Sequence, residues 1–147
     1  MAGATETTLR LIAEATDQKQ AILDYVGDLS DYQVLGARVL VAIKPPRRKT
    51  KGGIHLTDTN ASESQWTGNM GLLLKIGPSA FKYSGSGQHY AWEGIKPEVG
   101  QWVEFDPIGA RGVGIRGLMC KYVDSWQIGA IVPDAEMVDD GTNNLLR

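Results

Sequence analysis

The sequence predicts an all-β protein, a barrel or sandwich, from three observations. Eighteen glycines and six prolines among 147 residues are more than a helical protein of this length uses, and they indicate many turns. Short runs rich in branched and aromatic residues recur between those turns. An apolar content of 42% is sufficient for a packed core, and the length favours one domain with appended segments.

The first element is the exception, because residues from about Thr5 to Val26 have helical spacing. Thr5 or Thr7 can cap a helix here, and Gly27 is a suitable terminator. The apolar stripe of this helix is weak in its middle, and isolated helices of this length are barely stable. We therefore expect residues 1–31 to form a helical extension that docks only marginally on the β domain.

The β domain is expected over residues 32–138, followed by a polar tail over residues 139–147. Each predicted strand ends at a turn signal such as Gly-Pro, Asp-Pro or Asp-Ser. The expected strands are Tyr32 to Ile43 with a possible bulge at Gly36, Asn69 to Ile76, Gln101 to Phe105, a hairpin from Gly112 to Leu118 that leads into Met119 to Val123, and Trp126 to Val132.

A loop is predicted from Pro45 to Asp58, between two strands. It holds two prolines, a Gly-Gly pair and several cationic or hydroxyl side chains, yet it ends in the large aliphatics Ile54 and Leu56. In an extended chain these two side chains share a face and His55 points away. The segment is either a binding loop that orders on a partner or a surface loop whose last residues begin the next strand.

The charge is distributed unevenly along the chain. Five of the fifteen cations lie in or beside this loop, which leaves ten cations against seventeen acids elsewhere (15 − 5 = 10). A basic loop on an acidic body, without interleaved aromatic residues, does not favour nucleic-acid binding. The five cations are Lys44, Arg47, Arg48, Lys49 and Lys51.

A second excursion is predicted from Ser79 to Glu98, around a Ser-Gly-Ser-Gly sequence. Its aromatic residues either form a contact patch or fold back on the barrel rim. They are Phe81, Tyr83, Tyr90 and Trp92.

The sequence contains no catalytic constellation, and we expect no enzyme activity, no metal site and no cofactor. His55 and His89 both fall in loops without metal-ligand spacing. The glycines from Gly109 to Gly114 resemble a dinucleotide-binding motif, but no helix follows them. Cys120 is the only cysteine and suits a core position, and the absence of a signal peptide or an apolar span makes the cytoplasm the default compartment.

Five stretches, in this order, resemble the GroES-type co-chaperonin (chaperonin-10) family, and in particular its phage-encoded members. They correspond to an opening strand with Arg-Val before its aliphatic run, a Gly-Gly-aliphatic mobile loop, a strand ending in a glycine turn, a Val-Gly-x-hydrophobic-Val strand and a closing strand. They are Val34 to Val41, Gly52 to Leu56, Leu73 to Pro78, Val99 to Phe105 and Asp124 to Val132. His55 departs from the family pattern, as do the aromatic excursion and the added helix.

The resemblance implies a GroES-like irregular β-barrel with a mobile loop at about residues 45–66 and an excursion at about 79–98. It implies a homo-oligomeric, sevenfold ring in which the opening strand of one subunit pairs with the closing strand of the next. The interface would then use Val34, Leu35, Ile128 and Ile131, and the chaperonin would bind Gly52, Gly53, Ile54, His55 and Leu56.

The implied function is a co-chaperonin lid on a bacterial chaperonin, acting in the host cytoplasm on enclosed, viral proteins. The chaperonin partner would use the ATP, so this chain would need no cofactor of its own. The alternative is a virion structural or assembly protein that reuses the same barrel and contacts capsid or tail proteins, because a fold does not determine a function.

Overall fold

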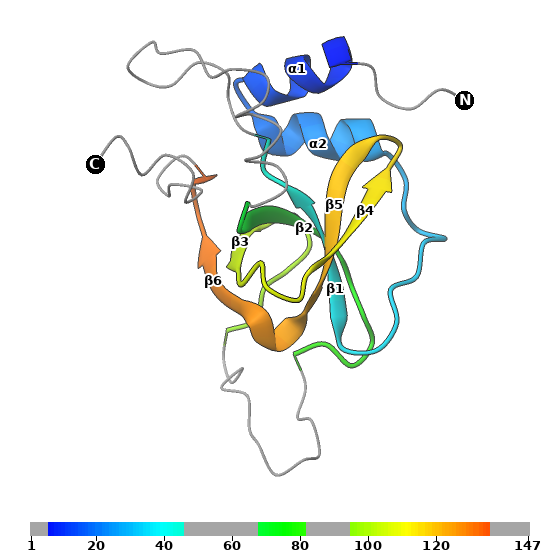
Figure 1. The fold of residues 1–147 in the computed structure, drawn as a ribbon, viewed down its shortest axis with the longest axis vertical. Coiled ribbons are helices and arrows are strands. Elements are labelled where there is room, and N and C mark those ends of the chain that lie inside the picture. Colours follow the sequence, from blue (N-terminus) through cyan, green and yellow to red (C-terminus); the bar gives the residue numbers. More distant parts are fainter. Residues whose placement is uncertain (1–5, 46–67, 82–94, 136–147) are drawn as a thin grey trace.

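A computed structural model describes residues 6–45, 68–81 and 95–135 of the chain (Figure 1). Its elements are α1 (Glu6–Glu14), α2 (Gln18–Val26), β1 (Arg38–Ile43), β2 (Met70–Ile76), β3 (Trp102–Phe105), β4 (Arg111–Ile115), β5 (Leu118–Asp124), the short 3₁₀ helix η1 (Ser125–Gln127) and β6 (Ile128–Val132). The six strands form one antiparallel sheet in the order β4-β5-β1-β2-β3-β6. The sheet curves strongly, and the helices lie together against one side of it (Figure 1). The predicted β-rich architecture is confirmed.

The N-terminal region forms two helices, so the prediction of one continuous helix is wrong. Asp17 is the reason, because its extended backbone and side chain start a new helix there. The carboxylate accepts a hydrogen bond from the backbone N–H of Gln20 at 3.1 Å, as an N-cap residue does. Gly27, at a φ of 68°, ends α2 as predicted.

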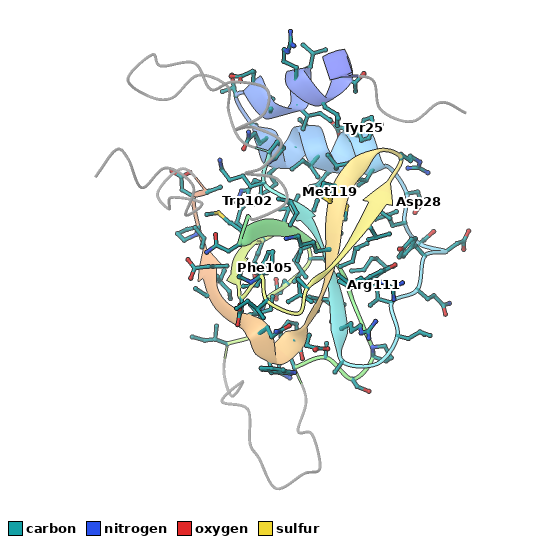
Figure 2. The ribbon with its side chains drawn as sticks, viewed as in Figure 1. Tyr25, Asp28, Trp102, Phe105, Arg111 and Met119 are labelled. Carbon is teal, nitrogen blue, oxygen red and sulfur yellow. The ribbon has the colours of Figure 1, made fainter. Side chains whose placement is uncertain are left out.

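The central strands are buried on both faces, which explains their continuous apolar runs. Neighbouring residues of a strand point to opposite faces, so Leu72 and Leu73 enter different cores. Trp102 and Phe105 of β3 likewise enter different cores (Figure 2). We name these the helix-side core, centred on Ile22, Val26, Leu40, Leu72, Trp102, Leu118 and Cys120, and the inner core, formed by Val39, Val41, Ile43, Leu73, Ala80, Phe81, Val103, Phe105, Val123 and Ile128.

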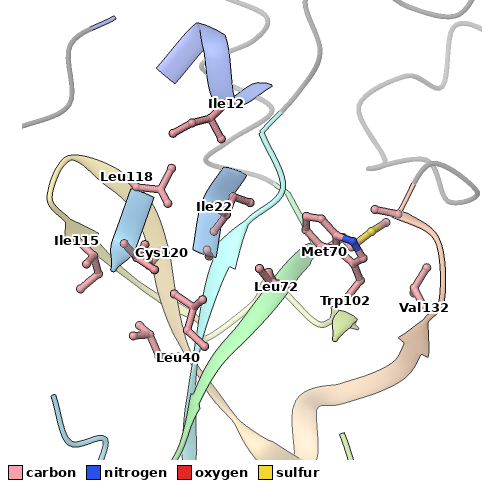
Figure 3. Packing of buried hydrophobic residues seen from close by; sticks show 14 of the residues in the cluster. Ile12, Ile22, Leu40, Met70, Leu72, Trp102, Ile115, Leu118, Cys120 and Val132 are labelled. Carbon is pink, nitrogen blue, oxygen red and sulfur yellow. The ribbon is translucent and has the colours of Figure 1, made fainter. Parts of the chain in front are cut away.

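The helices belong to the helix-side core, so the expectation of marginal docking is wrong. Ile22 and Val26 of α2 are 0% and 1% exposed, and Ile12 of α1 is 5% exposed. They pack with strand residues such as Leu40 and Leu72 in one cluster (Figure 3). Fully burying each such side chain stabilises the fold by about 1.5–3 kcal/mol. The helices therefore close one side of the β domain.

The hairpin between β4 and β5 fixes the far end of α2. Its two-residue turn, Arg116-Gly117, has positive φ at both positions (51° and 87°), as a type I′ turn requires. The Arg116 guanidinium donates to the carbonyl of Val26, and the Tyr25 hydroxyl donates to the carbonyl of Arg116. A cation thus satisfies a carbonyl at the C-terminus of α2, where the helix dipole favours it.

The opening strand is shorter than predicted. It begins at Arg38, whereas residues 32–35 are irregular and Gly36, at a φ of 68°, forms a turn with Ala37. The turn packs closely on Gly77, since a Cβ there would lie 2.5 Å from the Gly36 carbonyl oxygen. The closing strand is also shorter, because Trp126 lies in η1 and is 56% exposed.

Candidate functional site

The predicted chaperonin-binding residues lie outside the described residues. They are Gly52, Gly53, Ile54, His55 and Leu56. The structure does describe the residues on either side of their segment, 46–67, and so shows where this segment joins the β domain. Pro45 and Gly68 at its two ends are both buried, and the Lys44 N–H donates to the Met70 carbonyl at 3.0 Å. The segment therefore leaves and returns at neighbouring points, where β1 and β2 pair.

Gln18, at the start of α2, holds the first of these attachment points. It is 4% exposed, and its Nε2 donates to the carbonyl oxygens of Ala13 at 2.6 Å and Pro45 at 3.2 Å. The two bonds join the α1–α2 junction to the end of β1. Sequence reasoning did not find Gln18, because its partners lie 5 and 27 residues away and no local pattern marks them.

The second excursion begins at the other end of β1. Phe81 is buried, and its N–H donates to Ser125 Oγ at 3.1 Å. The Ser125 N–H in turn donates to the carbonyl of Ala37 at 2.9 Å, just before β1 begins. A six-residue strand spans about 20 Å. The two excursions are thus attached at opposite ends of the β domain. Tyr83, Tyr90 and Trp92 lie outside the described residues.

The four predicted interface residues fall into two pairs. Val34 (6% exposed) belongs to the helix-side core and Ile128 (7%) to the inner core, so each packs within this chain. Leu35 is 73% exposed and Ile131 is half-buried, so these two are accessible to a neighbour. The structure does not gather the four into one patch.

The closing strand β6 is an edge of the sheet. It pairs with β3, and among the described residues no strand covers its other side. Natural edge strands are commonly protected by charges or proline, yet β6 reads Ile-Gly-Ala-Ile-Val. Gly129 and Ala130 are exposed along it. Within the described part of the chain, the outer side of β6 is therefore an unpaired strand edge.

Two titratable groups of the helix-side core, Cys120 and Tyr32, are poor nucleophiles. Burial raises the pKa of the Cys120 thiol to about 12. Burial and the hydrogen bond between the Tyr32 and Tyr122 hydroxyls raise the pKa of Tyr32 to about 12. Within residues 6–45, 68–81 and 95–135, no three His, Cys, Asp or Glu side chains gather as metal ligands would. In the same part of the chain, no helix is both long and apolar enough to cross a bilayer.

Comparison of the chain with protein-family models and with curated protein sequences found no match.

Proposed function

We propose that this protein is a co-chaperonin with a GroES-like barrel that forms a ring-shaped lid on a bacterial chaperonin. The lid supports ATP-dependent folding of enclosed proteins, and the chaperonin uses the ATP. One observation carries the proposal: the segment with Gly52-Gly53-Ile54-His55-Leu56 is attached at both ends to neighbouring, buried points beside the paired strands β1 and β2. This attachment suits a loop that presents an apolar tip to a partner.

The attachment points also suit a lid with two distinct faces. The chaperonin-binding segment leaves one end of β1, and the aromatic excursion leaves the other end. In a ring of such subunits all the binding segments would emerge on one rim. The excursions would emerge on the opposite rim.

The open edge of β6 supports assembly by strand pairing. In the ring, the irregular residues 32–35 of one subunit lie along β6 of the next, and the exposed Leu35 contacts the neighbour. Val34 and Ile128 then support the pairing from within their own cores. Such a head-to-tail contact must either close into a ring or polymerise.

Multivalency makes the binding useful although one loop binds weakly. Ile54 and Leu56 contribute about 1.5–3 kcal/mol each when fully buried in an apolar groove. Ordering the loop costs about 1–2 kcal/mol per residue, which offsets most of that gain. Several loops on one ring supply avidity and still allow release when the chaperonin changes state.

Co-elution with a purified bacterial chaperonin in the presence of ATP tests the proposal. The wild-type protein is expected to co-elute, and Ile54→Asp is expected to abolish capture because every loop in the ring loses its anchor. His55→Val is the matched control, since in an extended segment His55 would point away from the face shared by Ile54 and Leu56. If Ile54→Asp rings still co-elute, the loop is not the docking element and the virion structural role becomes the better proposal.

Ring assembly is tested separately by Leu35→Asp. Leu11 of α1 offers a matched control, because it is 69% exposed and Leu35 is 73% exposed. Native mass spectrometry is expected to show loss of the oligomer for Leu35→Asp and an intact oligomer for Leu11→Asp. A wild-type protein that is only monomeric at micromolar concentration would contradict the ring.

A further inference from the structure

A polar cavity lies between the start of α2 and the chain just after β6, and the proposed function does not use it. Its volume is about 300 Å³, at the lower end of the range for small-ligand pockets. Described residues from three parts of the chain line it: Thr16, Asp17, Gln18 and Lys19 at the α1–α2 junction, Trp102 of β3, and Asp134 after β6.

The charges in the cavity favour a cation. Among the described residues that line it, Asp17 and Asp134 carry carboxylates and Lys19 carries an ammonium group, a formal charge of −1 for this part of the lining (1 − 2 = −1). Asp17 accepts a hydrogen bond from the Gln20 N–H through Oδ1, but a carboxylate can accept about four hydrogen bonds in all. Further acceptor capacity therefore remains at this helix start, beyond its role as a cap.

Gln18 adds a fixed acceptor that lacks a donor. Both N–H groups of its amide are used by the carbonyls of Ala13 and Pro45, so a flipped amide would place oxygen against two other oxygens. Its Oε1 is buried and has no hydrogen-bond partner in the described structure. A buried acceptor without a partner costs free energy, which a ligand N–H would recover.

Trp102 contributes an aromatic wall. The side chain is 5% exposed and is held in the helix-side core, so its ring is fixed before any ligand arrives. A guanidinium is planar, always charged and rich in donors, and it stacks on aromatic faces better than an ammonium does. Carboxylates, an unpaired carbonyl and an indole are the groups that such a cation requires.

We propose that this cavity is a binding site for a guanidinium group, with Asp17, Asp134 and Gln18 as acceptors and Trp102 as the stacking surface. The group belongs either to a small free guanidine or to an arginine side chain of another polypeptide. Both sources present the same chemistry, and the experiment distinguishes between them.

The test is a titration of the full-length protein followed by the indole N–H resonance of Trp102. Loss of one indole signal in Trp102→Phe identifies that resonance. Three probes are compared: agmatine, N-acetyl-arginine methylamide and N-acetyl-lysine methylamide. We expect saturable shifts with the guanidinium probes and a response at least fivefold weaker with the lysine probe. Binding of agmatine alone assigns a free ligand, whereas binding of the arginine amide alone assigns a polypeptide side chain.

Asp134→Asn provides the matched variant, because Asp134 is exposed and its substitution leaves both cores intact. Loss of a charge-assisted hydrogen bond is expected to weaken binding about tenfold. Asp31→Asn makes the same chemical change beyond the opposite end of α2 and is expected to bind like the wild type. Equal responses to the arginine and lysine probes, equal affinity of Asp134→Asn and wild type, or no shift of Trp102 with any probe would each overturn the proposal.

Discussion

The two faces of the sheet are buried by different means. The inner core is built by the strands and their own connections, with Ala80 and Phe81 following β2. The helix-side core depends on residues that precede the sheet in the chain, namely Ile12, Ile22, Val26 and Val34. The N-terminal third is therefore part of the fold, although its composition separates it from the β domain.

Removing residues 1–27 is the strongest test of this comparison. The deletion would expose a row of strand residues on the helix side, including Leu40, Leu72 and Leu118, which are now at most 2% exposed. Each loses about 1.5–3 kcal/mol of burial, against a total stability of about 5–15 kcal/mol for a typical domain. We expect loss of soluble, folded protein, measured by solubility and circular dichroism. A soluble deletion variant with cooperative unfolding would show that the β domain folds without the helices.

The sequence predicted strands β2 and β3 better than the N-terminal region. Strands β2 and β3 begin one residue later than predicted and end as predicted, because Gly77-Pro78 and Asp106-Pro107 are strong local signals. The opening strand was predicted too long because Tyr32 and Val34 are apolar for another reason, as they pack in the helix-side core. Long-range packing, which a local pattern does not encode, decided their conformation.

Only the part of the candidate site that a local sequence motif marks could be predicted. The Gly-Gly-aliphatic motif is a local signal, but its residues lie outside the described structure and their role stays a prediction. Of the predicted interface, Val34 is buried because it faces the helix-side core, whereas its neighbour Leu35 faces neither core and is exposed. Gln18 precedes the β domain and Asp134 lies near its end, yet both line the polar cavity, so no local spacing could reveal them.

A matched pair of substitutions tests whether the two cores respond independently. Leu72 and Leu73 are neighbours in β2, both are 0% exposed, and they face different cores. Each substitution by alanine is expected to cost about 2–5 kcal/mol, measured by urea unfolding. Hydrogen exchange should separate the two. Leu72→Ala is expected to loosen α2 selectively, and Leu73→Ala is expected to leave the protection of α2 relative to the sheet unchanged. Equal loosening of α2 would mean that the two cores act as one.

The smallest expected effect is a difference in how the two faces respond to alkali. Tyr32 and Cys120 on the helix side both have a pKa raised to about 12, chiefly by burial. Their neutral forms are favoured in the folded state, so their contribution to stability is complete below the unfolded pKa values, about 9 for Cys and 10 for Tyr. That contribution is lost as the pH rises toward 12, because the unfolded chain releases these protons first.

Lys121 has the opposite effect on the pH dependence of stability. It follows Cys120 in β5 and points to the other face of the sheet. Strand alternation in β5 places it on the inner side, and burial lowers its pKa from 10.5. Its charged form is disfavoured in the folded state, so stability increases as the pH rises from its folded pKa toward 10.5.

We expect the free energy of unfolding, measured in urea from about pH 9 to 11, to fall less steeply in Tyr32→Phe than in the wild type. Lys121→Met should make the fall steeper just below pH 10.5, since the compensating group is gone. Identical pH slopes in all three proteins would mean that these side chains are solvated alike in the folded and unfolded states, and that the two faces do not differ in this respect.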